Sequence, residues 1–134
     1  PRAVLKPRVS ATAYGTHVVD REAALGPAEW EPLERSGCLL QEFVPEIQSR
    51  GEVSLVFLGG DFSHAMLKRP GAGDFRVQTD FGGTVEPVRP DPSVVEQARR
   101  ALLAAPGPVL YARVDGCLVD GRLRLMELEL HFYG

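Results

Sequence analysis

The chain has 134 residues, 44% of them hydrophobic, so it is long enough for one ordinary domain with a buried core. A formal net charge of −3 argues against a protein whose main task is to hold a nucleic-acid backbone, and we expect no nucleic-acid partner. No apolar run approaches the length that crosses a bilayer, so we expect no membrane partner either. Cys38 and Cys117 lie far apart in apolar, strand-like runs, which favours free core thiols in a cytoplasmic protein over the alternative, a disulfide.

The two ends of the chain indicate a piece of a longer protein. Pro1 leads directly into a strand-like segment, and Gly134 comes a few residues after an acidic strand. We therefore expect a further domain before Pro1 and more sequence after Gly134.

Alternating polar and apolar residues predict several strands in the first part of the chain. They are expected at residues 3–9, 17–19, 38–44, 52–58 and 62–68. Residues 20–36 are polar and partly helical, with interruptions by glycine and proline. A helix should begin at Asp91-Pro92, an N-cap followed by proline, and run to about Ala105. Hairpin-connected strands with few helices favour an α+β fold over a doubly wound sheet.

Acidic residues in the last two predicted strands carry the strongest chemical signal. The turn sequence at residues 119–122 predicts that these strands pair as a hairpin. Alternate residues of a strand share a face, so Asp115, Glu127 and Glu129 should gather beside Arg113. Crowded carboxylates repel one another unless a cation lies between them, and Mg²⁺ is the usual cation. The alternative is an exposed polar face without a metal.

Cationic residues flank a glycine-bearing loop at residues 70–73. They are Lys68, Arg69 and Arg76. Cations beside an acidic metal site are what a nucleoside triphosphate and its metal require together. The alternative is a solvated basic loop whose cations form surface ion pairs.

Two weaker signals lie earlier in the chain. Lys6 interrupts an apolar strand and is followed by a loop of small residues, 10–16, whose backbone amides could cradle a phosphate. The Walker pattern is absent, and a lone lysine at a strand end is commonly structural. Residues 40–46 alternate as a strand end, for which solvated polar positions are an equally good explanation.

Taken in order, these segments resemble the ATP-grasp superfamily, most closely the group of bacterial glutathione synthetase, ribosomal-protein glutamate ligase and D-alanine–D-alanine ligase. The resemblance runs from about Val4 to Leu130. It implies two α+β lobes with mostly antiparallel sheets, which grip ATP between them. Residues 1–44 would be part of the small lobe and residues 45–134 the large lobe, truncated at its carboxyl end and without the amino-terminal domain of the family.

The resemblance also implies a set of nucleotide-binding residues. Lys6 matches the small-lobe lysine at the phosphates, Gln41 and Val44 match the adenine-binding hinge, and Glu46 matches the ribose ligand. Either Lys68 or Arg69 matches the large-lobe cation. The full set is Lys6, Ser10, Gly15, Thr16, Gln41, Glu42, Val44, Glu46, Lys68, Arg69 and Arg76.

The same resemblance implies catalytic and metal-binding residues. Arg76 would hold the γ-phosphate and then the acyl-phosphate, and Arg113 would support the tetrahedral intermediate. Two Mg²⁺ ions, for which Mn²⁺ could substitute, would bind Asp115, Glu127 and Glu129. The chain departs from the family at Gln78 and Glu129, where Asn is common, and residues 131–134 lack the expected Pro-Ser loop.

The activity implied is that of an ADP-forming ligase that makes C–N bonds from small-molecule carboxylates and amines through an acyl-phosphate. The region alone should be inactive. A non-catalytic nucleotide-binding module, an intramolecular cyclo-ligase and a β-rich interaction domain without nucleotide remain alternatives. The acid, the acceptor and the oligomeric state, including a homo-oligomer, are open.

Overall fold

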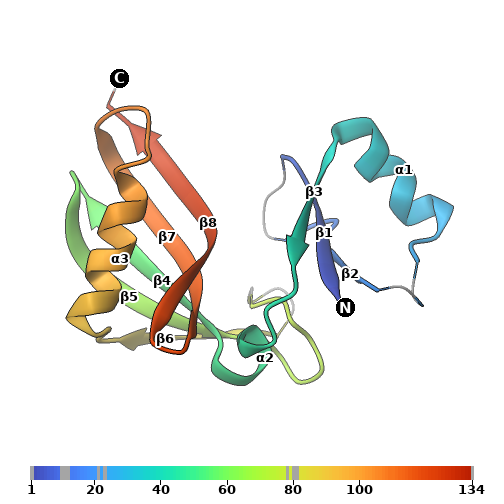
Figure 1. Cartoon of the computed structure of the whole chain (residues 1–134), viewed down its shortest axis with the longest axis horizontal. Helices are drawn as coiled ribbons and strands as arrows, with labels where there is room; N and C mark the ends of the chain where they lie inside the picture. Colours follow the sequence, from blue (N-terminus) through green and yellow to red (C-terminus); the bar gives the residue numbers. More distant parts are fainter. Residues whose placement is uncertain are drawn as a thin grey trace. The chain divides into compact units, whose positions relative to one another are not determined.

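The computed structural model describes residues 2–9, 13–20, 22, 24–77, 79 and 82–133. The chain divides into two compact units, Pro1–Pro45 and Glu46–Gly134, each with an antiparallel sheet (Figure 1). The class is therefore α+β, as predicted. No helix in the described ranges combines the length and the apolar character that a membrane crossing needs.

The first unit is a small antiparallel sheet with strand order β2-β1-β3. Its elements are β1 (Ala3–Pro7), β2 (His17–Val19), α1 (Pro27–Ser36) and β3 (Cys38–Glu42). The Glu29 carboxylate accepts a hydrogen bond from the Gly26 amide at 3.0 Å, which starts α1 after the predicted break. The strand predicted to reach residue 9 ends at Pro7, which has no N–H to donate to a ladder.

The second unit is a five-stranded antiparallel sheet with strand order β6-β5-β4-β7-β8. The described segments of this unit also include two helices. The elements are α2 (Glu46–Arg50), β4 (Glu52–Leu58), β5 (Asp61–Arg69), β6 (Thr84–Val88), α3 (Pro92–Leu102), β7 (Val109–Val119) and β8 (Arg122–Phe132). Neither α2 nor β6 was predicted. The helix α2 has only one turn, and β6 is an exposed edge strand that contains Pro87, so neither has a clear sequence period.

The core of the second unit lies between the sheet and α3 (Figure 1). The Asp91 carboxylate caps α3 by accepting a hydrogen bond from the Ser93 amide at 2.8 Å. The helix ends at Leu102, three residues before the predicted end. The core is formed by buried side chains of α3, β4, β5 and β7, namely Val53, Leu55, Phe57, Ala65, Val94, Ala98, Val109, Ala112 and Val114.

The opposite face of this sheet carries a polar patch, and a bulge in β8 makes that possible. Asp115 pairs with Glu127, but the next residue, Gly116, pairs with Leu125, so Met126 is an extra residue. Cross-strand partners share a face. The bulge therefore lets Leu123, before it, and Leu128, after it, both lie on the core face, while Glu127 lies on the polar face beside Asp115. Gly116 allows the close approach, since a Cβ there would lie 2.6 Å from the Arg124 carbonyl oxygen.

The two thiols are free, as expected, but they differ in burial. Cys117 is buried in the second unit, and burial raises the pKa of its thiol to about 12. Cys38 is exposed, so the prediction of a core position is wrong for it. Cys38 is the first residue of β3, and the first three residues of this strand are all exposed. The apolar run around Cys38 therefore does not mark a core.

Candidate functional site

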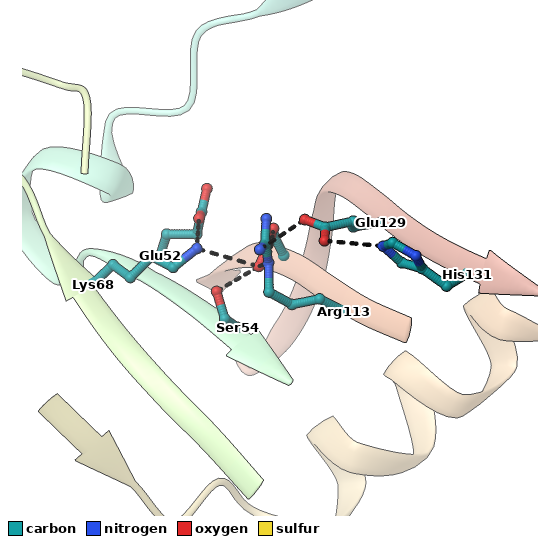
Figure 2. Close-up of polar contacts among 7 residues, drawn as sticks. Glu52, Ser54, Lys68, Arg113, Glu129 and His131 are labelled. Carbon is teal, nitrogen blue, oxygen red and sulfur yellow. Dashed lines mark hydrogen bonds and ion pairs between the residues drawn. The ribbon is translucent and has the colours of Figure 1, made fainter. Parts of the chain in front are cut away.

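Strand register brings the predicted acidic residues to one face of the second sheet. Asp115 lies opposite Glu127, and Arg113 lies opposite Glu129, so the predicted pairing of the last two strands is confirmed. On the other side of β7, Asp115 lies opposite Ser54 of β4. These residues belong to a polar cluster that extends over four neighbouring strands, and Figure 2 labels its members Glu52, Ser54, Lys68, Arg113 and Glu129. Its members are Glu52, Ser54, Lys68, Arg113, Asp115, Glu127 and Glu129.

Asp115 is the buried centre of this cluster, with a relative exposure of 1%. The Arg113 Nε donates to both of its oxygens, at 3.0 Å and 2.8 Å, and the Ser54 hydroxyl donates to Oδ1. The Lys68 ammonium lies 3.6 Å from Oδ1. A buried carboxylate needs such partners, and here two cations of the chain itself supply them.

Arg113 links Asp115 to the carboxylate of the neighbouring strand. Its Nη1 lies 2.8 Å from Glu129 Oε2, and Glu129 Oε1 lies 3.7 Å from His131 Nε2. Burial lowers the pKa of Arg113, but the hydrogen bond to Asp115 and the charges of Asp115 and Glu129 outweigh it and raise the pKa. The guanidinium therefore stays charged and is held in one orientation.

Glu52 is a cluster member that the sequence reasoning missed. Its Oε1 lies 3.4 Å from the Lys68 ammonium, and their side chains are only 12% and 17% exposed. Burial and then the charge of Asp115 raise the pKa of Glu52 to about 7, although Lys68 opposes the shift. The predicted strands at residues 52–58 and 62–68 leave a turn at residues 59–61, and counting outward from it pairs Glu52 with Lys68, so hairpin register was the signal. The structure reaches the same pairing with a turn at residues 59–60 and a register shift between Val56 and Phe57.

Glu127 differs from Asp115 in its surroundings. It is exposed, and within the described part of the chain no ion pair or hydrogen bond to its side chain is found. Its charge contributes to the raised pKa of Glu52, which places it within electrostatic reach of the cluster. Its carboxylate is therefore available to an external cation.

The cluster was predicted to hold Mg²⁺. Among the described residues, no three His, Cys, Asp or Glu side chains are arranged so that they could hold a metal ion. The donor types nevertheless fit Mg²⁺, because Asp115, Glu127 and Glu129 offer carboxylate oxygens on one sheet face. The repulsion from which the metal was inferred is relieved in part by Arg113 and Lys68.

The two candidate cations at the end of β5 have different surroundings. Lys68 belongs to the polar cluster, whereas Arg69 forms an ion pair with Glu86 of β6 and both of those side chains are largely exposed. The geometry therefore brings Lys68, and not Arg69, to the predicted metal-binding residues.

Arg76 lies in the loop after β5 and is held by the carboxylate of Asp74. Its Nη2 lies 2.7 Å from Oδ2, and its Nε lies 3.1 Å from Oδ1. The backbone amides of Phe75 and Arg76 also donate to Asp74 Oδ1. The hydrogen bond from Arg76 lowers the pKa of Asp74 to about 2. Gln78, where the family commonly has Asn, lies outside the described residues.

The remaining predicted nucleotide ligands belong to the first unit or to the start of the second. Lys6 lies on β1 opposite Leu39, and the hinge candidates Gln41 and Glu42 end β3. Val44 is buried, and Glu46 begins α2. In the predicted phosphate loop, Gly15 has φ +70° and the Thr16 amide donates to the Ala13 carbonyl, while Ser10 lies outside the described residues.

Comparison with known proteins gives structural neighbours only. No family model and no curated protein matches the chain. The crystal structure of the D-cycloserine synthetase DcsG matches with 27% identity and a TM-score of 0.68, over 98% of this chain and 48% of that one. The D-alanine–D-alanine ligase from Bacillus anthracis, complexed with ATP, matches with 20% identity and a TM-score of 0.63, over 95% of this chain and 40% of that one.

A third neighbour is the ATP-grasp ligase PsnB, solved with a phosphomimetic variant of its minimal precursor, Mg and ADP. It matches with 21% identity and a TM-score of 0.64, over 96% of this chain and 38% of that one. The chain thus spans less than half the length of each of these proteins. The two neighbours below 25% identity establish the fold alone.

Proposed function

By its fold the chain belongs to the ATP-grasp superfamily, and on this basis we propose that it is the ATP-binding, Mg²⁺-dependent region of a carboxylate–amine ligase. The observation that carries the proposal is the polar cluster, which combines carboxylates with Lys68 and Arg113 on one sheet face. Solved neighbours contain ATP, or ADP and Mg, which supports nucleotide and magnesium use in the family.

The proposed reaction has two steps. A carboxylate oxygen of the substrate attacks the γ-phosphorus of ATP, the bond from that phosphorus to the bridging oxygen breaks, and ADP leaves. The nitrogen of an amine then attacks the acyl carbon of the acyl-phosphate, which releases inorganic phosphate and a proton. No protein nucleophile is needed, so catalysis consists of positioning and charge neutralisation.

Named residues supply that neutralisation. Lys68 and Arg76 bind phosphate oxygens, and Arg113 stabilises the negative charge that develops on the attacked acyl group. Asp115, Glu127 and Glu129 would hold Mg²⁺, which when bound neutralises phosphate charge. The proposed nucleotide ligands of the first unit and of α2 are Lys6, Ser10, Gly15, Thr16, Gln41, Glu42, Val44 and Glu46.

A ligase that closes a ring within one substrate is a second candidate. It is favoured by the resemblance to DcsG, because the name of that synthetase denotes a cyclic product. A ring-forming ligase would release ADP with a single substrate and no added amine. Its product would be lighter than the substrate by one water.

The experiment is ADP release by the full-length protein with Mg²⁺, ATP and a panel of carboxylic acids, with hydroxylamine added to trap an acyl-phosphate as a hydroxamate. We expect ADP release to require an acid. ATP binding without turnover would instead favour the non-catalytic module, and turnover without any acid would contradict the ligase reaction.

Two matched variants sharpen this test. Glu127→Gln should abolish turnover and keep the thermal midpoint of unfolding, since Glu127 is exposed and makes no ion pair in the described ranges. Asp115→Asn should also abolish turnover but destabilise the fold by about 1–3 kcal/mol, because buried partners lose a charged acceptor. Glu96→Gln, an exposed change on α3, is the control. Full turnover by Glu127→Gln would contradict the metal assignment.

A further inference from the structure

The Lys68 ammonium group is shared by two carboxylates from neighbouring strands. It lies 3.4 Å from Glu52 Oε1, a contact that Figure 2 shows, and 3.6 Å from Asp115 Oδ1. All three side chains are largely removed from solvent. At this depth the ammonium group attracts each of the two carboxylates more strongly than it would in water.

The backbone fixes this arrangement before any ligand binds. Glu52 and Lys68 are direct cross-strand partners at the open end of the β4–β5 hairpin. Gly51 precedes Glu52 with φ +82°, and a Cβ at Gly51 would lie 2.3 Å from the Lys68 carbonyl oxygen. The backbone of Lys68 thus approaches Gly51 more closely than any residue with a side chain would permit.

We propose that Glu52 is a positioning residue that holds Lys68 beside Asp115, so that the nucleotide-free protein keeps an ammonium group where the carboxylates would otherwise gather a divalent cation. The inference rests on the proposed function, because an incoming triphosphate is the partner that would draw Lys68 away. The release of Asp115 then lets the metal enter together with the nucleotide, and the free protein has little affinity for the metal alone.

The charges of the cluster agree with this role. Asp115 raises the pKa of Glu52 and Lys68 lowers it, so the two carboxylates repel each other and the ammonium offsets that repulsion. Without the ammonium group, nothing from Lys68 would offset the repulsion between Glu52 and Asp115, to which the exposed carboxylate of Glu127 adds. The carboxylate oxygens of these three residues are donors of the kind that Mn²⁺ and Mg²⁺ prefer.

The test is Mn²⁺ binding to the whole 134-residue chain without nucleotide, followed by the electron paramagnetic resonance signal of free Mn²⁺. It is made at about pH 8, above the pKa of Glu52 in the wild type. Lys68→Met should bind Mn²⁺ about tenfold more tightly than the wild type, the low end of what a neighbour of a metal ligand contributes. Lys68→Arg keeps the charge and should bind as the wild type does.

Two further variants test the mechanism. Arg69→Met, which removes the neighbouring exposed cation, should leave Mn²⁺ affinity unchanged. The double variant Lys68→Met with Glu52→Gln should lose the gain in Mn²⁺ affinity. The reason is that, of the two carboxylates released from Lys68, only that of Asp115 remains. An equal gain in Arg69→Met, or no gain in a Lys68→Met chain of normal circular dichroism, would overturn the inference. These readouts involve no ATP, so they are independent of whether the proposed ligase activity is found.

Discussion

At the scale of single residues, the environment of Glu52 has a consequence for stability. Burial and the charge of Asp115 hold its pKa near 7, whereas the ordinary value is 4.5. Between those two values the folded protein binds more protons at this group than the unfolded chain does. The free energy of unfolding must therefore fall as the pH rises through this window, since the carboxyl group has to ionise in a buried position.

Glu52→Gln tests this, because glutamine mimics the protonated acid and has no proton to lose. The variant should gain stability relative to the wild type as the pH rises from about 5 to about 8. Urea unfolding at several pH values measures the difference, and Glu96→Gln on the exposed face of α3 is the control. A difference that does not change with pH would mean that the carboxyl group of Glu52 titrates normally.

At the scale of elements, the β4–β5 hairpin depends on a glycine at its open end. The Gly51 amide donates to the Ile47 carbonyl of α2, and its positive φ turns the chain into β4. Any side chain at this position meets backbone atoms of β5, which do not move aside as a flexible side chain would. The position thus joins the end of α2 to the strand that carries Glu52.

Gly51→Ala should therefore destabilise the protein by at least about 2 kcal/mol, from backbone strain together with the contact to Lys68. Gly107→Ala is the matched control, because a Cβ there meets nothing within 4 Å and its φ is not positive. Denaturant unfolding of both variants measures the difference. Equal midpoints would show that the hairpin end relaxes to accept a side chain.

The bulge in β8 acts at the same scale. It changes which residues face the core, so Leu125 and Leu128 lie on one face although they are three positions apart. The leucines alternate on each side of Met126 but not across it, and this break in the period was visible in the sequence. It marks the place where the strand adjusts so that the acidic residues stay beside Asp115.

At the scale of the whole molecule, the nucleotide should stabilise the folded chain if the proposed function is right. ATP at about one hundred times its dissociation constant should add about 2.7 kcal/mol to the free energy of unfolding. The gain should require Mg²⁺ and disappear with a chelator. Thermal unfolding with ATP, with ATP and Mg²⁺, and with Mg²⁺ alone measures it. Protection by ATP that persists in the chelator would indicate nucleotide binding without the metal.

Much of the fold was predictable because its signals are local. The closing pair of strands, the β4–β5 turn and the capped helix α3 all follow from alternation, turn residues and an N-cap within a few positions. The weak elements α2 and β6 were missed, because a five-residue helix and an exposed edge strand are held by their neighbours and not by a period of their own.

The sequence by itself determined that Arg113 shares a strand face with Asp115, and Glu127 with Glu129, because alternation decides this within each strand. A two-residue turn alone would pair Asp115 with Met126, so it is the bulge in β8 that brings the two pairs to one sheet face. Only the tertiary structure decided that Asp115 is buried and that Lys68, but not Arg69, reaches it. The physical reason is that burial depends on which strand lies in the middle of the sheet. That order joins β4 to β7, segments more than fifty residues apart, and no local pattern encodes it.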